Sequence, residues 1–335
     1  MSKNNIPFKA LLVEESGNGK FQRSIATRMI SDLPRGDLLI QVKYSALNYK
    51  DALSASGNRG VTKQYPHTPG VDAAGLVIES NVLDFREGDP VLVTGYDLGM
   101  NTSGGMAEYI RVPAEWVIPL PPGLSLKESM ILGTAGLTAG IGLFKMEKMG
   151  QRPEMGPIVI TGASGGVGSV AVGLFAKAGY EVIASTGKKS AEDLLFSLGA
   201  SRVVDREFVQ DLSGRPLIKP LWAGALDTVG GTTLSTLLKG CSREGNVASS
   251  GLVGSNELST TVFPFILNGI NLLGIDSATF PRDLRLEVWH KYSKEWRIPA
   301  VENIATFCRL NEIDPFIEKI LLGKTIGRVV VTMNE

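Results

Sequence analysis

Residues 160–172 read ITGASGGVGSVAV, an apolar run that leads into a glycine-rich turn and then into small apolar residues. Two glycine patterns fit this stretch. Ending on Gly168, it reads Ala163-x-Gly165-x-x-Gly168, a dinucleotide-binding fingerprint whose first glycine is replaced by alanine. Beginning at Thr161, it reads T-G-x-x-x-G-x-G, a nucleotide-binding pattern of a different enzyme class. The residues around the stretch must decide between the two patterns.

Short apolar runs alternate with helical stretches on both sides of this turn. We expect strands at residues 157–161, 181–185, 203–205, 224–227, 246–250 and 271–275, and helices at residues 167–178 and 191–198. Before them, residues 126–149 read as two helices around the small-residue stretch 133–140. Strands that alternate with helices predict an α/β fold with a Rossmann-like, doubly wound parallel sheet.

The first part of the chain has a different pattern of apolar and turn-forming residues. Short apolar runs at residues 38–44, 75–79 and 90–94 are separated by Pro, Gly and Asp, as in a small barrel or sandwich. The cluster PLPPG at residues 119–123 marks a boundary, and residues 328–332 predict one more strand. With 335 residues, two domains are expected. We place a β-rich domain at 1–125, a Rossmann domain at 126–269 and a return to the first domain at 270–335.

Composition excludes several classes of function. Lys plus Arg and Asp plus Glu both number 34, so no excess charge indicates binding to nucleic acid or to an anionic membrane. The first 15 residues contain no apolar signal core, and no run approaches the roughly 20 apolar residues of a membrane span, which favours the cytoplasm. Two cysteines, Cys241 and Cys308, are too few for a disulfide framework or a structural zinc knuckle.

The T-G-x-x-x-G-x-G pattern is typical of short-chain dehydrogenases. Those proteins have a single domain, carry the pattern on their first strand and require a Tyr-x-x-x-Lys pair further along the chain. Here Tyr180 is followed four residues later by Ala184, and Tyr292 by Trp296. The domain order and the missing pair exclude the short-chain interpretation.

The dinucleotide fingerprint remains, and its glycines have a steric purpose. Gly165 lets a pyrophosphate approach the backbone, and Gly168 lets the helix pack closely on the strand. The N–H groups at the start of the helix, from Gly166 onward, then face the phosphates. We therefore predict a dinucleotide cofactor.

The end of the second Rossmann strand predicts which cofactor. NAD sites usually place an acidic residue about 20 residues after the fingerprint, to hold the ribose diol. Residues 185–189 instead read STGKK, and the first acid is Glu192. Hydroxyls and cations suit a 2′-phosphate, so NADPH is favoured, with Arg202 as a second cation. The alternative is that Lys188 and Lys189 only begin a solvated helix.

Taken together, these features resemble the medium-chain dehydrogenase/reductase superfamily over essentially the whole chain, and within it the zinc-independent quinone-oxidoreductase and acryloyl-CoA reductase branch. The resemblance implies a β-rich GroES-like catalytic domain, a Rossmann NADP-binding domain and a homodimer that pairs through the apolar strand at 271–275. Eight motifs carry it in order: LNYKD (47–51), PGVDAAG (69–75), GGMAEY (104–109), GTAGLTA (133–139), TGASGGVGS (161–169), LGASRVVDR (198–206), LDTVGG (226–231) and GR (327–328).

Zinc-dependent members of that superfamily place a Cys in the segment that corresponds to LNYKD, and Gly-His-Glu where this chain has Gly70-Val71-Asp72. Catalytic zinc requires about three His, Cys or carboxylate ligands. The chain has only two histidines, His67 and His290, so we expect no metal. Since zinc polarises an alcohol or carbonyl oxygen, its absence favours a conjugated C=C bond as the hydride acceptor.

The resemblance narrows the activity to NADPH-dependent reduction of the C=C bond of an α,β-unsaturated carbonyl, with acryloyl-CoA reduced to propionyl-CoA. A second enzymatic interpretation is a broad quinone or enone reductase that does not use CoA. A third, from another class, is a non-catalytic NADPH-sensing binding protein.

The resemblance also assigns residues to roles. For catalysis, Tyr49, or a water held by Asn48 and Asp51, delivers a proton to the substrate; alternatively, Tyr49 only orients the nicotinamide. Arg59 and Lys63 meet CoA phosphates, or are ordinary charges on an exposed loop. The implied cofactor-binding residues are Tyr49, Thr138, Ser164, Gly165, Gly166, Val167, Ser185, Thr186, Lys188, Arg202, Leu252, Ile266, Ser277 and Arg328.

Overall fold

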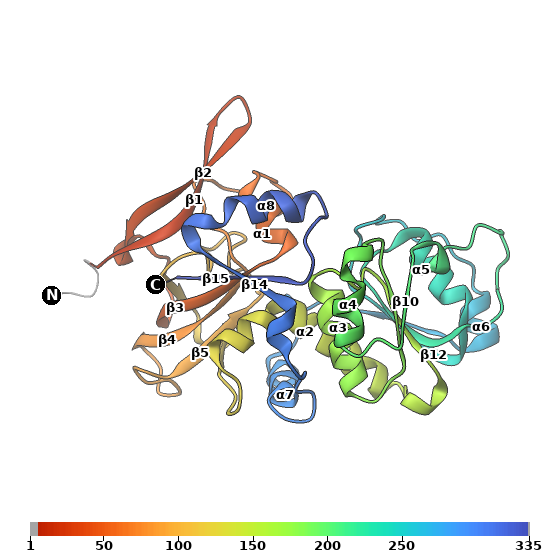
Figure 1. Ribbon diagram of the computed structural model, residues 1–335. Helices are drawn as coiled ribbons and strands as arrows, with labels where there is room; N and C mark the ends of the chain where they lie inside the picture. Colours follow the sequence, from red (N-terminus) through yellow and green to blue (C-terminus); the bar gives the residue numbers. More distant parts are fainter. Residues whose placement is uncertain (1–5, 334–335) are drawn as a thin grey trace. The chain divides into compact units, whose positions relative to one another are not determined.

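The computed structural model describes residues 6–333 (Figure 1). Residues 1–5 and 334–335 lie outside the described part, and so does the beginning of the N-terminal segment that lacks an apolar signal core. The chain forms two compact units. Unit 1 contains Met1–Thr134, Ala278–Glu287 and Ala305–Glu335, and unit 2 contains Ala135–Ser277 and Val288–Ile304. The first change of unit thus lies at residue 134, whereas the sequence placed a boundary at residue 125.

Unit 1 is built around a mixed, mostly antiparallel sheet. Within the described residues its strand order is β14-β15-β3-β4-β5-β7, and β6 also pairs with β3. In β3, Leu38, Ile40 and Val42 alternate into one core, as the two-residue period of a strand requires. The elements of this unit are the hairpin β1 (Pro7–Gly17) and β2 (Lys20–Met29), β3 (Leu38–Leu47), α1 (Tyr49–Ala55), β4 (Asp72–Ser80), β5 (Pro90–Thr94), β6 (Tyr109–Val112), β7 (Val117–Pro119), β14 (Ala305–Arg309), α8 (Asp314–Leu321) and β15 (Arg328–Thr332).

Unit 2 contains a parallel sheet with the order β10-β9-β8-β11-β12-β13. Counted from β8, this is the order 3-2-1-4-5-6 of doubly wound dinucleotide-binding sheets, which confirms the predicted fold class. Its elements are β8 (Ile158–Ile160), α3 (Gly166–Lys177), β9 (Val182–Ser185), α4 (Glu192–Ser197), β10 (Arg202–Val204), β11 (Trp222–Asp227), α5 (Gly231–Lys239), β12 (Cys241–Ser249), α6 (Phe263–Asn268) and β13 (Asn271–Gly274). The order reverses between β8 and β11, and ligands of such sheets bind at the carboxyl ends there.

Helix α2 (Leu126–Lys148) is interrupted at Gly133, as the two-helix prediction for residues 126–149 requires. Gly133 has a positive φ of 51°, and a Cβ there would lie 2.5 Å from the Asp72 carboxylate. Contrary to the expectation from sequence, α2 is long and apolar enough to cross a membrane by length and composition. However, 89% of its apolar window is buried inside the protein, as in the core helix of a globular domain. Helix α7 (Arg282–Tyr292) completes the set.

Candidate active site

The motif LNYKD forms the start of α1 in unit 1. Asn48 is the residue before the helix, and Tyr49 is its first residue. The Asp51 carboxylate accepts the backbone N–H of Asn48 at 2.7 Å and that of Val71 at 2.9 Å. The side chain of Asp51 is fully buried, whereas that of Tyr49 is 49% exposed. Of the three residues predicted for catalysis, Tyr49 is the one that solvent reaches most easily.

Asn48 connects a buried polar network that we call the Asn48 cluster: Asn48, Asp51, Asp72, Thr134 and Arg328. Its amide group donates to Asp72 at 2.8 Å and to Asp51 at 3.2 Å, and accepts from Arg328 at 3.0 Å. Asp72 also accepts the hydroxyl of Thr134 at 2.6 Å and its backbone N–H at 2.9 Å. Arg328 forms an ion pair with Asp72 at 3.7 Å. Four segments that are far apart in the sequence therefore meet at one point.

Burial dominates the electrostatics of this cluster. Burial raises the pKa of Asp51 to about 7, and hydrogen bonds from Asn48 and Val71 only partly oppose it, while the charge of Asp72 adds to it. Burial also raises the pKa of Asp72, against the lowering effect of Arg328, and lowers the pKa of Arg328, against the effect of both carboxylates. Arg328 thus forms an ion pair with Asp72 and acts on Asp51 only through its charge, while the side chains of all three residues are buried.

By the resemblance described above, Gly70-Val71-Asp72 corresponds to the Gly-His-Glu of the zinc-dependent enzymes. In that correspondence Val71 takes the position of the ligand histidine and offers no ligand atom. In the part of the chain that the structure describes, no group of three or more His, Cys, Asp or Glu residues is arranged to hold a metal ion.

In unit 2, the glycine-rich stretch forms a tight turn between β8 and α3. Gly162 has a φ of 56°, and the N–H of Gly165 donates to its carbonyl at 2.8 Å. A Cβ at Gly168 would lie 2.3 Å from the carbonyl oxygen of Gly162, so this position requires glycine. Helix α3 then begins at Gly166 with neither a side-chain cap nor an acidic residue in its first turn. A helix start of this kind suits a phosphate group. The residues predicted to bind the pyrophosphate, from Ser164 to Val167, all lie in the turn or at this helix start.

The end of β9 meets this turn. The hydroxyl of Thr186 donates to that of Ser164 at 2.7 Å and accepts the N–H of Lys188 at 3.1 Å. Ser185 donates to the carbonyl of Asp205 at 3.2 Å. The structure therefore brings together four of the residues that were predicted to bind the phosphates and the adenosine end of the cofactor.

The second cation near Lys188 is Arg206. The guanidinium of Arg202 lies over the ring of Phe208, 4.7 Å from its centroid. Arg206 lies against Gly187, where a Cβ would come within 2.4 Å of its Nε. Burial, followed by the charge of Arg206, lowers the pKa of Lys188.

Sequence reasoning missed Arg206, although it ends the motif LGASRVVDR. Val204 in β10 pairs with Ser185 in β9. In a parallel pair, residues two positions beyond these partners stay close together, so Arg206 lies beside Gly187. This register was the signal that could have identified Arg206.

The remaining cofactor predictions in unit 2 have different surroundings. The hydroxyl of Thr138 donates to that of Ser277 at 2.9 Å, so these two residues lie together. Leu252 and Ile266 are 66% and 68% exposed.

In unit 1, Arg59 has partners within its own unit. Its guanidinium donates to Glu15 at 2.6 Å and to the carbonyl of Lys63 at 2.7 Å, and it lies over the rings of Phe21 and Tyr65. The side chain of Lys63 is exposed. Arg59 thus connects its loop to the β1–β2 hairpin. This role does not depend on a bound substrate.

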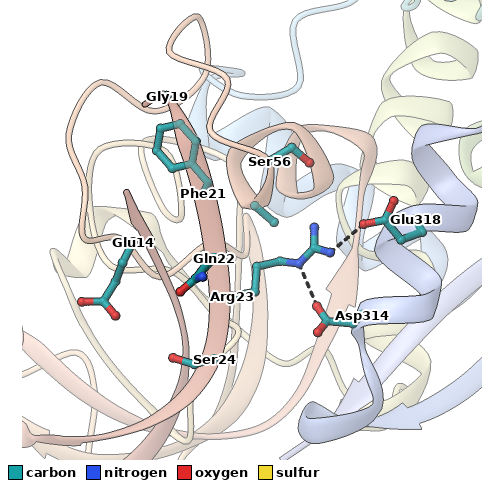
Figure 2. Close-up of a pocket in the computed structure, with 10 residues that line it drawn as sticks. Glu14, Gly19, Phe21, Gln22, Arg23, Ser24, Ser56, Asp314 and Glu318 are labelled. Atoms are coloured by element: carbon teal, nitrogen blue, oxygen red, sulfur yellow. Dashed lines mark hydrogen bonds and ion pairs between the residues drawn. The ribbon is translucent and has the colours of Figure 1, made fainter. Parts of the chain in front are cut away.

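A polar groove of about 530 Å³ in unit 1 lies against the same hairpin, the end of α1 and α8 (Figure 2). Arg23 crosses it and binds Asp314 at 2.8 Å and Glu318 at 2.6 Å. The residues that line the groove are not those predicted for catalysis, cofactor or substrate. We interpret the Arg23 contacts as the attachment of α8 to the hairpin.

Comparison with known proteins shows which family the chain belongs to. The family model of the alcohol dehydrogenase GroES-like domain matches residues 34–122, and that of the zinc-binding dehydrogenases matches residues 166–293. The putative quinone oxidoreductase YhfP of Bacillus subtilis (strain 168) is 44% identical over 329 residues, which cover 97% of this chain and 99% of YhfP. The chain belongs to the medium-chain dehydrogenase/reductase superfamily. It is an oxidoreductase of that superfamily.

Other members of the superfamily are similar along their whole length. Acrylyl-CoA reductase AcuI of Ruegeria pomeroyi is 40% identical, covering 98% of this chain and 99% of AcuI. The oxidoreductase YhdH of Salmonella enterica, solved in complex with NADP, has a TM-score of 0.94 and 41% identity, covering 97% of this chain and all of that one. B. subtilis YhfP, solved with NAD bound, has a TM-score of 0.96 and 43% identity, covering 98% of this chain and all of that one.

Proposed function

We propose that the protein catalyses NADPH-dependent reduction of the C=C bond of an α,β-unsaturated carbonyl, with acryloyl-CoA as the preferred substrate. The composition of the Asn48 cluster carries this proposal. A network of amide, carboxylates and guanidinium lies in the segments that, by the resemblance, correspond to those of the zinc ligands in the metal-dependent enzymes, and Val71 supplies no ligand atom. Without a Lewis acid on the substrate oxygen, a conjugated acceptor is favoured, because its carbonyl delocalises the charge that hydride attack creates.

The end of β9 supports NADPH as the reductant. Ser185, Thr186, Lys188 and Arg206 provide hydroxyls and two cations at the place where an NAD site carries an acid. Charge-assisted hydrogen bonds to a 2′-phosphate would use both cations. The phosphate-binding turn has the small residues and the open helix start that a dinucleotide requires.

The bound NADPH supplies the hydride, which goes to the β carbon of the substrate. The α carbon then takes a proton, either from the phenol of Tyr49 or from a water. Because Asn48 and Asp51 direct their polar atoms into the cluster, we assign them to holding the start of α1, and thereby Tyr49, in place. We propose Tyr49, half exposed at this position, for contact with the nicotinamide ring.

Oxidation of NADPH should be measured with acryloyl-CoA, crotonyl-CoA, free enones and quinones. We expect the highest kcat/KM with acryloyl-CoA. A higher value with quinones or free enones would support the alternative of a broad quinone or enone reductase, which the name of YhfP favours. Tight NADPH binding without turnover of any acceptor would support the third interpretation, a non-catalytic NADPH-sensing binding protein.

We also propose that the protein is a homodimer that pairs through β13. This strand ends the sheet of unit 2, and Leu272 on it is 37% exposed. Helix α6, which precedes β13 in the chain, also has exposed apolar side chains at its start and in it, Val262 at 62% and Leu267 at 48%. An apolar sheet edge invites pairing with a second copy. Analytical ultracentrifugation should show a dimer that Leu272→Lys dissociates; a monomeric wild type would exclude this arrangement.

A further inference from the structure

A second network in unit 2 ties the ends of β8 and β11 together. Asp227, the last residue of β11, has a fully buried side chain. Its carboxylate accepts the hydroxyl of Thr161 at 2.7 Å, the N–H of Gly230 at 2.8 Å and the N–H of Val229 at 3.2 Å. Thr161 directly follows β8 and directly precedes Gly162, the first residue of the phosphate-binding turn.

Thr161 is held on every polar atom. Its N–H donates to the carbonyl of Leu226 at 3.1 Å, and its hydroxyl oxygen accepts the N–H of Thr228 at 3.0 Å. The hydroxyl of Thr228 donates to the carbonyl of Thr161 at 2.9 Å. Gly162 packs on that hydroxyl so closely that a Cβ would lie 2.3 Å from it. The direction in which the turn leaves β8 is therefore set by Thr161 and its three partners, Leu226, Asp227 and Thr228.

Asp227 also holds a second segment, through its backbone. Its carbonyl accepts the N–H of Ser250 at 2.9 Å and the hydroxyl of Ser250 at 3.1 Å. Ser250 follows β12 and precedes Gly251 and Leu252, the latter predicted to bind cofactor. Gly251 lies against the backbone of Thr228, where a Cβ would come within 2.2 Å of the carbonyl oxygen. One residue thus connects the carboxyl ends of β8, β11 and β12.

We propose that Asp227 is a positioning residue for cofactor binding: through Thr161 it fixes the phosphate-binding turn, and through Ser250 the segment that follows β12. The inference rests on the proposed function, since it assumes that the turn binds a dinucleotide. Asp227 touches no phosphate in this scheme and acts only through its neighbours. A carboxylate suits this role because it accepts three N–H or O–H donors at once, whereas a neutral amide turns one of its two polar atoms into a donor.

The test is equilibrium binding of NADPH and NADH to wild type, Asp227→Asn, Thr161→Val and Thr161→Ser, well below the unfolding temperature. Loss of a hydrogen bond to a charged group corresponds to roughly tenfold in affinity. We expect Asp227→Asn and Thr161→Val each to raise the Kd of both cofactors by about this factor, without changing their ratio. Thr161→Ser, which keeps the hydroxyl, should bind nearly as the wild type does.

The double variant Asp227→Asn/Thr161→Val should raise the Kd by less than the product of the two single effects, because the two residues share the Thr161–Asp227 hydrogen bond. A lower unfolding temperature of both single variants with unchanged Kd values would overturn the inference and leave Asp227 a purely structural residue. If Asp227→Asn does not fold, the comparison of Thr161→Val with Thr161→Ser still decides. Failure of the wild type itself to bind either cofactor would instead overturn the proposed function, and the inference with it.

Discussion

The Asn48 cluster and the phosphate-binding turn both sit at the start of a helix, but they use it differently. At α1, Asp51 lies in the first turn and accepts the N–H of Asn48. At α3, the residue before the helix is Gly165, and the first turn contains no acid. The start of α1 is thus capped by a side chain of the chain itself, whereas that of α3 is left for an anion. One helix start is therefore built for rigidity and the other for a ligand.

This difference predicts which variants should lose stability and which should lose affinity for the cofactor. Changes in the Asn48 cluster disturb buried charges, so they should lower stability first. Changes around the phosphate-binding turn disturb groups that meet the cofactor, so they should lower affinity first.

Replacing Arg328 should have the largest effect. Arg328→Met leaves the buried carboxylate of Asp72 without its ion-pair partner, and breaking a buried pair typically costs about 3–5 kcal/mol. The free energy of unfolding, measured in urea, should fall by this amount. The matched control is Arg59→Met, because Arg59 and its partner Glu15 are both about half exposed. Exposed pairs contribute about 0–1 kcal/mol. Equal losses for the two variants would show that the cluster contributes no more than a surface pair.

The contrast between the two sites also explains what the sequence could predict. The phosphate-binding turn, from Gly162 to Gly168, consists of consecutive residues, so the steric requirements of its glycines can be read from the motif. The strands of unit 2 were predicted because a buried parallel strand is a short apolar run, and the 3-2-1-4-5-6 order follows from the doubly wound fold.

The Asn48 cluster could not be predicted in the same way. Asn48, Asp72, Thr134 and Arg328 come from four segments whose meeting depends on the packing of β4, β15 and the break in α2. The Asn48-x-x-Asp51 spacing at a helix start indicates the bond between these two residues. Nothing local indicates their meeting with Asp72, Thr134 and Arg328. Arg206 lies between these cases, since it becomes visible only when the register of β9 and β10 is known.

Removing the cations near Thr186 should weaken NADPH binding selectively. If Lys188 and Arg206 bind the 2′-phosphate as proposed, Lys188→Ala and Arg206→Ala should each remove one charge-assisted contact, a loss of about 1.5–3 kcal/mol, or roughly 10- to 150-fold in Kd. The Kd of NADH should hardly change. Isothermal titration calorimetry with both cofactors measures the ratio. Arg202→Ala is the control, because the guanidinium of Arg202 lies over Phe208. If Arg202→Ala discriminates against NADPH more strongly than Arg206→Ala does, the assignment of the second cation is wrong.

Neutralising Asp51 should change how stability depends on pH. Its pKa is raised from 3.8 to about 7, mainly by burial, so the folded chain retains a proton that the unfolded chain loses within this range. The contribution of Asp51 to the free energy of unfolding is thus largest below pH 3.8, declines as the pH rises towards 7 and is lost above it. Asp51→Asn stays neutral, so its stability relative to wild type should rise over the same range.

Urea unfolding of Asp51→Asn and wild type at several pH values across this range measures the effect. Asp211→Asn serves as the control, because a hydrogen bond from Ser213 lowers the pKa of Asp211 and it titrates below the range. Parallel pH profiles of wild type and Asp51→Asn would mean that Asp51 is ionised throughout.

The smallest effect is expected from removing the hydroxyl of Tyr49. Tyr49→Phe keeps the ring, which is half exposed at the start of α1, and keeps the backbone that the Asn48 cluster holds. If Tyr49 only orients the nicotinamide, kcat at saturating NADPH should remain within about threefold of wild type, whereas loss of a general acid costs about 10²–10⁴-fold. Turnover of acryloyl-CoA distinguishes the two outcomes. A loss of 10²-fold or more would make the phenol the proton donor, and the start of α1 would then serve catalysis directly in addition to holding the ring.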